Sequence, residues 1–488
     1  MTTTHGLAGD VENTAEPVED PADGVAVRQV RAALQELLPD AAVITDRARL
    51  RTYECDGLAH YRVTPAVVVL AEDTGQVATT VRVCAEYGVP FVARGSGTGL
   101  SGGALPRADG VLVVTSRMRA IREVAAADQR AVVEPGVINL DVTRAATADG
   151  YYYAPDPSSQ QICSIGGNVA ENSGGAHCLK YGFTANHVVG AEFVTPDGTV
   201  VELGGRAPDS PGYDLLGAVV GSEGTLGIAT VLTLRLTRTP EAVRTVLAAF
   251  DSTDDAGAAT SAIIGAGIVP AAIELMDALA IEAAEAAVHC RYPEGAGAVL
   301  VVEVDGPAPE VERELAQVEE HCRACGAFEF RVAADDEERA LIWRGRKSAF
   351  AAVGRISPDY IVQDGVIPRT ALPQVLRSIT ALSESSGVRV ANVFHAGDGN
   401  LHPLVLFDES EPGQSEAAEQ VSGKILDLCI EAGGSITGEH GVGMDKMAYL
   451  PRMFSDTDLD TMQMVRCAFD PRQLSNPGKI FPTPRLCG

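Results

Sequence analysis

The chain is poor in positive charge. Of its 488 residues, 38 are lysine or arginine and 66 are aspartate or glutamate, so the formal net charge is -28 at pH 7. A field of this sign repels nucleic acid phosphates and anionic lipids, which excludes a nucleic-acid-binding role. It also opposes any anionic cofactor or substrate, so a site for one needs donors of its own. Each arginine near a motif is therefore a candidate for that task.

Long apolar runs are missing as well, and so is a cysteine pattern that would predict disulfides or a metal cluster. No stretch of about 18 apolar residues occurs, and the N-terminus lacks the basic-then-apolar order of a signal peptide. We expect a cytoplasmic chain without direct membrane insertion, whose membrane association would come through partner subunits. The ten cysteines are scattered and are expected to be thiols rather than disulfides. Cys322 and Cys325 form the one close pair, and no iron–sulfur array is present.

The order of apolar segments predicts an α+β protein of several parts. Residues 1–24 are acidic and poor in large apolar side chains, so we expect a disordered tail. Strand and helix patterns over residues 25–240 form a first domain, and after Pro240 they begin again over residues 241–445. Residues 446–488 are too few to fold alone and are expected to pack back on the first domain.

A glycine-rich loop follows the strand predicted to end at Ala93. Its segment from Gly97 to Gly102 has the GxGxxG spelling of a dinucleotide fold, which requires a helix directly after it. Here Pro106 and Asp109-Gly110 follow, and then a strand, so the loop joins two strands. Glycines let backbone N–H groups turn toward an anion, which favours phosphate binding over a merely flexible surface loop.

Two further segments share this character. Residues 155–175 and residues 221–228 combine small side chains, hydroxyls and amides with close access to the backbone. Each segment alone is also typical of structural turns. Three of them in one domain predict a long ligand that is held along its length, as a dinucleotide is.

On these three segments the chain resembles the FAD-binding oxidoreductases of the vanillyl-alcohol oxidase and p-cresol methylhydroxylase type, and among them the glycolate oxidase group. The resemblance extends over about residues 50–482. It implies a two-subdomain FAD-binding fold over residues 25–240 and an α+β, ferredoxin-like substrate cap over residues 241–445. FAD would be bound noncovalently, because the first loop has no histidine to tether it. The implied FAD contacts are Arg94, Gly95, Ser96, Gly97, Thr98, Gly99, Ser101, Gly102, Pro155, Asp156, Ser159, Ser164, Gly166, Gly167, Asn168, Ser173, Gly174, Gly175, Glu223, Gly224, Ile228 and Asn476.

Two histidines flank another glycine-rich turn. His395 ends one apolar run and His402 begins the next, with Asp398-Gly399 between them. Asp-Gly between apolar strands predicts a two-residue hairpin turn. That turn would place His395 opposite His402, with Cβ atoms about 5 Å apart on one face of the hairpin.

A bend near the C-terminus adds further ligand types. Gly438-Glu439-His440-Gly441 supplies a carboxylate and an imidazole, and two histidines with one glutamate suit a divalent metal such as zinc. Hairpin histidines that pair without a metal are the alternative. The resemblance implies that His395, His402 and Glu439 bind the metal and that His440 is the general base.

The resemblance also implies a carboxylate-binding residue. Trp343-Arg344-Gly345-Arg346 is similar to the W-x-x-R pattern of the family, so Arg346 is the candidate for binding a substrate carboxylate, with a surface ion pair as the alternative. Related 2-hydroxyglutarate enzymes have a hydroxyl and a lysine soon after this arginine. Here Phe350 stands nearby and no lysine follows in residues 361–363, which favours a substrate without a second carboxylate.

The implied activity is oxidation of a small 2-hydroxy acid, glycolate or D-lactate, by hydride transfer to FAD. Electrons would pass to a partner subunit or a quinone, and the glycolate enzymes work with a second flavin subunit and an iron–sulfur subunit. Two other functions stay open. A metal-dependent hydrolase would use His395, His402 and Glu439 but leave the glycine segments without a task. A subunit that binds a flavin but does not catalyse a reaction would leave His440 without a task.

Overall fold

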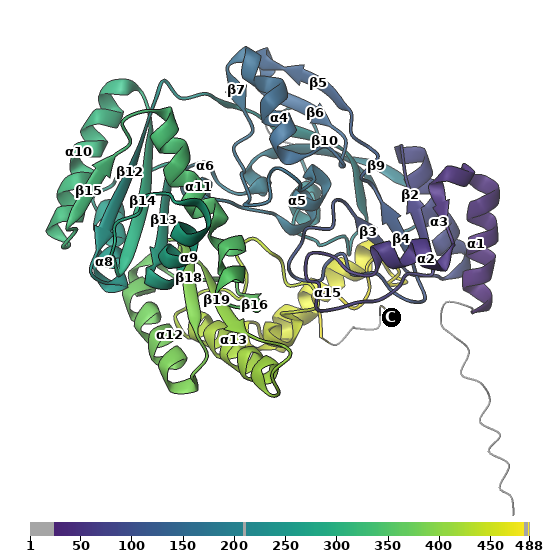
Figure 1. The fold of residues 1–488 in the computed structure, drawn as a ribbon. Coiled ribbons are helices and arrows are strands. Elements are labelled where there is room, and N and C mark those ends of the chain that lie inside the picture. The colour runs from purple at the N-terminus through teal and green to yellow at the C-terminus, as the bar shows by residue number, and fades with distance from the viewer. Residues whose placement is uncertain (1–23, 208–210, 483–486, 488) are drawn as a thin grey trace, which may run out of the picture.

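The computed structural model describes residues 24–207 and 211–482 together with Cys487, and its sheets lie side by side along the molecule (Figure 1). All but the last residue of the tail expected over residues 1–24 lies outside the described residues. The first sheet has the strand order β1–β2–β4–β3, with β2, β4 and β3 parallel. Its strands are β1 Val43–Ile44, β2 Val67–Leu70, β3 Phe91–Arg94 and β4 Val111–Val114.

Helices α1 (Val25–Leu37) and α3 (Thr74–Tyr87) cover one face of this sheet. The helix α3 begins where the Asp73 side chain accepts the backbone N–H of Gln76, and it ends at Gly88, whose φ of 71° is left-handed. All four residues of β2 are buried, as expected of an apolar run in a parallel strand. The β-α-β opening predicted from the sequence is therefore present.

The second sheet is antiparallel and has the order β5–β6–β10–β8–β9. Its buried side contacts α4 (Asn139–Ala146) and α5 (Ile165–Glu171). The hairpin predicted at Pro196-Asp197-Gly198 forms, with the side chain of Asp197 accepting the N–H of Thr199 at 3.0 Å. The strand bounds are β5 Ile121–Ala125, β6 Arg130–Val133, β8 Val188–Val194, β9 Val200–Gly204 and β10 Ile228–Arg235.

The third sheet has eight strands and forms the cap (Figure 1). Its order is β15–β12–β14–β13–β18–β19–β16, with β17 also paired to β19. The first four strands, with α8 after β12 and α10 after β14, form the predicted ferredoxin-like unit. The strand bounds are β12 Ala242–Phe250, β13 Ala272–Asp277, β14 Ala298–Gly306, β15 Glu329–Val332, β16 Asp359–Val362, β17 Gly365–Val366, β18 Val390–His395 and β19 Asn400–Phe407.

Helices cover both faces of the cap sheet. One face packs on α8, α10, α12 and α13, and the other packs on α9 and α11. Apolar residues on both sides of β14 are therefore buried, and the polar side chains on this strand must find partners inside the protein. The helix bounds are α8 Thr253–Gly265, α9 Ala278–Val288, α10 Ala308–Ala324, α11 Asp336–Ala352, α12 Leu372–Ser386 and α13 Gln414–Glu431.

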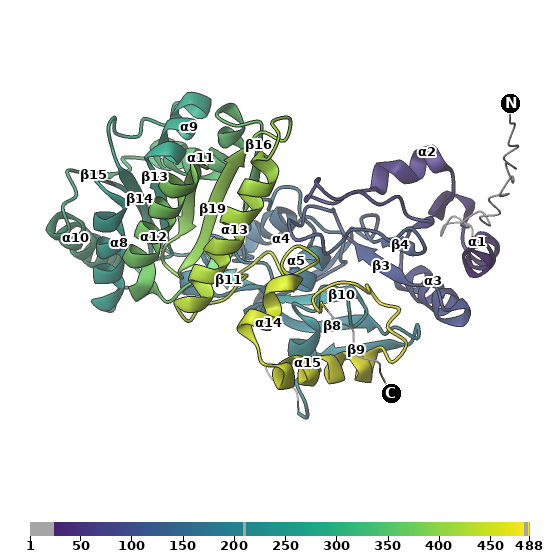
Figure 2. The same ribbon diagram turned by 90° about the horizontal axis from the view of Figure 1, so that it is seen from below.

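The last segment returns to the N-terminal half. Figure 2 shows α15 (Asp456–Phe469) beneath the sheet that contains β8 and β9, and Phe469 packs on the apolar cluster of that sheet. Beyond α15, the Asn476 N–H donates to the Phe91 carbonyl at 2.7 Å. Residues 475 and 476 therefore pack against β3 at the edge of the first sheet.

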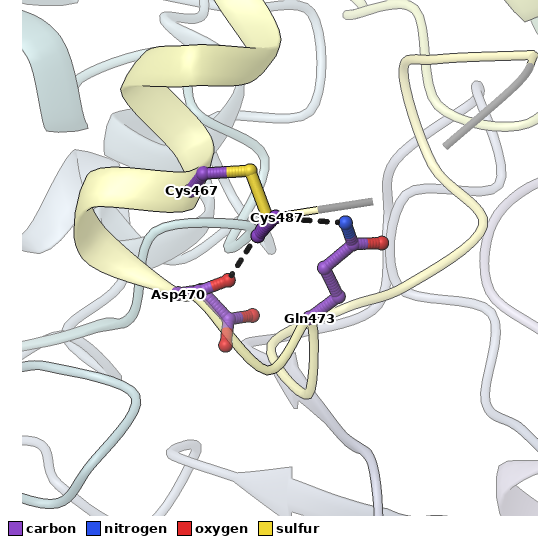
Figure 3. Close-up of a disulfide and its surroundings, with 4 residues drawn as sticks. All are labelled: Cys467, Asp470, Gln473 and Cys487. Atoms are coloured by element: carbon purple, nitrogen blue, oxygen red, sulfur yellow. Dashed lines mark hydrogen bonds between the residues drawn. A yellow bond between two sulfur atoms is a disulfide. The ribbon is translucent and has the colours of Figure 1, made fainter. Parts of the chain in front are cut away.

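One expectation about the cysteines is wrong. Cys467 of α15 is joined to Cys487 by a disulfide (Figure 3). The two residues lie 20 positions apart, and the sequence has no motif that would have paired them. The other eight cysteines are free thiols, six of them buried and two at intermediate depth, as expected. Among the residues that the structure describes, no helix combines the length and apolar character needed to cross a membrane.

Candidate functional site

A cavity of about 1140 Å³ lies where the two N-terminal sheets meet the cap. All three glycine-rich segments line it, together with residues of α11, residues 359–363 and the bend that carries Glu439 and His440. Small-molecule sites usually have volumes of about 300–1,000 Å³, so this cavity is large enough for an extended cofactor beside a small substrate.

The first glycine-rich loop joins β3 to the parallel strand β4, as the sequence predicted. The Arg94 guanidinium donates to the carbonyls of Tyr53 at 3.3 Å and Cys55 at 2.6 Å. Arg94 lines the cavity, but these donors are committed to the backbone. Both bonds come from Nη1, so this nitrogen ties the start of the loop to residues 53–55.

Glycines of all three segments leave room for a ligand. A Cβ added to Gly99 or Gly224 would meet nothing nearer than 3.9 Å or 3.7 Å. A Cβ on Gly167 would meet only the Ser164 hydroxyl, at 3.4 Å. Since all three positions line the cavity, a bound group can approach the backbone closely there, which fits a dinucleotide cradle.

Most of the predicted FAD contacts line this cavity, and seven do not. The Asn476 amide donates to the carbonyls of Gly103 at 2.9 Å and Glu223 at 2.6 Å, so it ties two of the glycine segments together. Asp156 faces His177 and Lys347 instead. The residues that do not line the cavity are Ser101, Gly102, Pro155, Asp156, Gly174, Gly175 and Asn476.

The histidine hairpin has a different register from the predicted one. The ladder pairs His395 with Asn400 and Val393 with His402, so the connection has four residues, Ala396–Gly399. The two-residue turn needs left-handed backbone at both central positions, and of Asp398 and Gly399 only the glycine has it, with φ 83°. His395 and His402 are therefore diagonal neighbours, with ring centroids 5.0 Å apart.

The three predicted metal ligands converge. The Oε1 atom of Glu439 lies 3.3 Å from Nε2 of His395 and 3.0 Å from Nε2 of His402. Both Nε2 atoms and Oε2 of Glu439 are buried without a hydrogen-bond partner. Burial alone would raise the pKa of Glu439, but the two histidines outweigh it and hold that pKa well below its usual value. Buried polar atoms without protein partners usually bind an ion or a water molecule, and this donor set fits a divalent cation.

Neighbouring groups orient both imidazoles. The Glu274 carboxylate lies 2.8 Å from Nδ1 of His395, and the Gln363 carbonyl lies 3.2 Å from Nδ1 of His402. A proton on each Nδ1 leaves Nε2 free as a ligand, which is how metal-binding histidines are commonly fixed. Sequence reasoning missed Glu274, because it is on β13, 121 residues before His395.

Asp364 holds the bend that carries Glu439 and His440. Its carboxylate accepts the backbone N–H groups of Gly438 at 3.0 Å, Glu439 at 3.2 Å and His440 at 2.9 Å. Asp364, His402, Glu439 and His440 each have one ligand atom within 4.8 Å of one another. The three bonds from the bend all go to Oδ2, and Oδ1 accepts the Glu439 N–H at 3.3 Å, so the Asp364 carboxylate serves the bend and His395 is the better third ligand. Nothing in the sequence around Asp364 indicated this role.

Glu223 holds the other half of the same bend. Its carboxylate accepts the N–H groups of Val442 and Gly443, both at 2.7 Å, and burial raises its pKa to about 7. The bend is thus fixed by one carboxylate from the cap and one from the N-terminal half. Glu223 lines the cavity as predicted, but its side chain serves the bend.

His440 faces the cavity beside the cluster. Its ring stacks on His402 with centroids 5.1 Å apart, and its Nδ1 is buried without a partner. Burial lowers its pKa to about 4, so the imidazole is neutral near pH 7. A neutral imidazole with an unoccupied nitrogen can accept a proton from a ligand in the cavity.

Arg346 is buried and paired. Its guanidinium lies 2.5 Å from Glu274, the same carboxylate that contacts His395. It does not line the cavity, whereas Lys347 and Phe350 of the same helix do. The Nε atom of Arg346 is buried without a hydrogen-bond partner. The alternative of a surface ion pair is wrong, because only 3% of the Arg346 side chain is exposed.

Two family models match the chain. One describes an FAD binding domain and matches residues 65–204, and the other describes the C-terminal domain of FAD linked oxidases and matches residues 239–480. The glycolate oxidase subunit GlcD of Escherichia coli is 49% identical over 94% of this chain and 92% of its own. The corresponding protein of Bacillus subtilis is 39% identical over 88% of this chain and 92% of its own. A D-lactate dehydrogenase of Anaerostipes hadrus is 31% identical over 91% and 96%.

Solved structures agree on the fold. A 4-ethylphenol oxidase of Gulosibacter chungangensis superposes with a TM-score of 0.78 at 19% identity, covering 95% of this chain and 99% of that one. A p-cresol methylhydroxylase superposes with a TM-score of 0.78 at 15% identity, covering 93% and 96%. The predicted FAD-binding fold is therefore confirmed.

Proposed function

This chain belongs to the FAD-linked oxidases, in the group of the glycolate oxidase subunit GlcD, and on that basis we propose that it oxidises glycolate or D-lactate to the 2-oxo acid. FAD is its cofactor, and it is an FAD-linked 2-hydroxy acid oxidoreductase. The observation that carries the proposal is the position of His440, which lines the cofactor cavity with an unpartnered nitrogen beside the metal-type cluster. The hydrolase alternative has no support from these relatives.

Each group of the cavity has a distinct task in this proposal. FAD, when bound, supplies the acceptor for the hydride that leaves the substrate α-carbon. His440 accepts the hydroxyl proton at its free nitrogen. His395, His402 and Glu439 would hold a divalent metal, which supplies Lewis acidity toward the substrate oxygen.

Arg346 is the proposed partner of the substrate carboxylate. In this structure it contacts Glu274 and lies behind the cavity wall, and its Nε is a nitrogen without a hydrogen-bond partner that a carboxylate would have to reach. Phe350 packs between these groups, with its ring 5.8 Å from the Arg346 Cζ and 5.7 Å from the His402 ring. Phe350 also lines the cavity. Because its ring is apolar, it favours a short substrate over one with a second carboxylate.

FAD attachment and subunit assembly are the remaining parts of the proposed function. Noncovalent attachment of FAD is inferred from the first loop, which has no histidine among residues 94–103. The relatives of the GlcD group are named as subunits, so we expect this chain to work in a complex that receives its electrons. A second flavin subunit and an iron–sulfur subunit are the expected partners, and membrane association would come through them. A quinone is the alternative acceptor.

An anaerobic absorbance titration tests the substrate. The FAD-loaded protein is mixed with glycolate, D-lactate, L-lactate and D-2-hydroxyglutarate in separate experiments. Glycolate or D-lactate should bleach the flavin band, and D-2-hydroxyglutarate should be the weakest substrate. Full FAD loading with no bleaching by any of the four acids would overturn the proposal.

Metal analysis tests the cluster independently. Protein purified without chelator should contain about one divalent metal ion per chain, and His402→Gln should lose it while retaining FAD. His321→Gln, on the outer helix α10, is the matched control and should keep both. A metal-free protein with full activity would remove the metal from the proposal.

A further inference from the structure

His177 joins the two halves of the molecule. It precedes α6 (Cys178–Tyr181) in the N-terminal half, and its backbone N–H donates to the Asp156 carboxylate at 3.2 Å. The ring nitrogen Nδ1 lies 3.0 Å from Asp156, and Nε2 lies 3.3 Å from Glu303 on β14 of the cap. One imidazole thus bridges two carboxylates that belong to different parts of the fold.

Glu303 accepts hydrogen bonds from three residues on two cap elements, β12 and α11. It accepts the Thr245 hydroxyl of β12 at 2.5 Å, the Trp343 indole N–H of α11 at 2.8 Å, and two N–H groups of Arg339 of α11 at 3.0 Å and 2.9 Å. Only 3% of its side chain is exposed. A buried carboxylate with this many donors stays ionised and fixes the position of its partners.

The bridge touches the helix that carries the substrate-binding candidates. The His177 ring stacks on Trp343 with centroids 5.7 Å apart and an interplanar angle of 29°. Lys347, one turn farther along α11, has its ammonium 3.8 Å from Asp156 and 5.8 Å from the Trp343 ring centroid. Lys347 lines the cavity, and its neighbour Arg346 is paired to Glu274 behind the histidine cluster.

We propose that His177 is a positioning residue, whose charged ring clamps the N-terminal half to the cap and thereby sets α11 relative to the cofactor cavity. The inference rests on the proposed function, because it names how Arg346 and Lys347 are placed for a carboxylate substrate. Burial would by itself lower the pKa of His177, but Asp156 and Glu303 outweigh it and raise that pKa to about 10. The charges that face the ring are Asp156, Glu303, Arg339 and Lys347.

The expected effect is on substrate binding rather than on the cofactor. A displacement of about 1 Å in a positioned group can cost roughly a hundredfold in rate. His177→Gln retains an amide that can bond to one carboxylate but cannot carry the charge. It should raise the KM for the hydroxy acid about tenfold or more, with a smaller change in kcat, and leave FAD content unchanged. His321→Gln is the matched control and should leave all three values as in the wild type.

A double-mutant cycle separates positioning from general stability. Oxalate, a dicarboxylate that cannot be oxidised by hydride transfer, serves as the probe, and its Kd is measured from the shift in flavin absorbance. If His177 acts through α11, the effects of His177→Gln and Lys347→Met on the oxalate Kd will be less than additive. Additive effects, or an unchanged Kd in His177→Gln, would overturn the inference.

The same titration distinguishes failure of the proposed function from failure of the proposed role of His177. A wild-type flavin that responds to neither hydroxy acids nor oxalate would remove the proposed function, and the inference with it. A wild type that responds and a His177→Gln variant that responds equally would remove only the role of His177. Trp343→Phe deletes one hydrogen bond to Glu303 but keeps the His177 bridge, so its KM should change less than that of His177→Gln.

Discussion

The glycine-rich cradle and the histidine cluster meet in one cavity but are built by opposite means. In the cradle, polar side chains such as Arg94 and Asn476 turn back onto backbone carbonyls, and the backbone itself is left open to a ligand. In the cluster, the backbone is held by Asp364 and Glu223, and side-chain atoms are left without partners. Substitutions in the cradle should therefore weaken FAD binding when they add side-chain volume. Substitutions in the cluster should slow the reaction when they remove a functional atom.

The largest effect is expected at His440. His440→Asn retains a side chain of similar reach but has no basic nitrogen to accept the proton. We expect the rate of flavin reduction by substrate to fall by roughly 10²–10⁴-fold, as for loss of a general base. Stopped-flow absorbance measures this rate. FAD content and Tm should stay close to those of the wild type, and an unchanged rate would remove His440 from the chemistry.

The next effect is expected at Asp364. Asp364→Asn replaces the charged acceptor of three backbone N–H groups, all bonded to Oδ2, by a neutral amide that accepts weaker hydrogen bonds, so the bend should loosen. Groups that orient metal ligands commonly contribute about 10–100-fold in metal affinity. Competition with a chromophoric chelator measures that affinity. Equal affinities in the variant and the wild type would show that the bend does not depend on Asp364.

A smaller effect, on FAD binding, is expected from a substitution in the glycine-rich cradle. Gly99→Ala adds a methyl group where the protein leaves free space, so the fold without FAD should keep its Tm. FAD binding should weaken by about 1–3 kcal/mol, the usual cost of overpacking. Isothermal titration of the FAD-free protein with FAD measures the loss. The control is Gly205→Ala, which meets no atom within 4 Å and lies away from the cavity.

The pH dependence of the His177 bridge gives the smallest effect. The pKa of His177 is raised from 6.5 to about 10 in the folded protein, so its contribution to stability is complete below about 6.5 and is lost as pH rises toward 10. The Tm of the wild type should therefore fall between pH 7 and pH 10. The Tm of His177→Gln should fall less over the same pH range. If the plots of Tm against pH for the two proteins are parallel, the His177 imidazole does not carry the charge.

The sequence was sufficient for the fold but not for the surroundings of the site. Pro106 and Asp109-Gly110 showed correctly that the glycine loop joins two strands. The hairpin register was wrong by two residues, because Asp398 does not take the left-handed backbone that a two-residue turn requires.

Long-range partners explain what else was missed. Glu274 and Asp364 lie on β13 and beside β17, far along the chain from His395 and from the Glu439 bend, and no local pattern links them. The partner of Cys467 near the C-terminus was missed for the same reason. Residue type and spacing identified the atoms that face a ligand, whereas the groups that hold those atoms depend on the packing of the whole cap.

The central claim is that this cavity brings a 2-hydroxy acid to FAD beside His440. The most direct measurement is the anaerobic titration of the FAD-loaded wild type and of His440→Asn with glycolate and D-lactate. The account predicts that at least one of the two acids bleaches the wild-type flavin within the mixing time or shortly after, and that the variant, equally loaded with FAD, reacts far more slowly. A fully loaded wild type that no hydroxy acid reduces would contradict it.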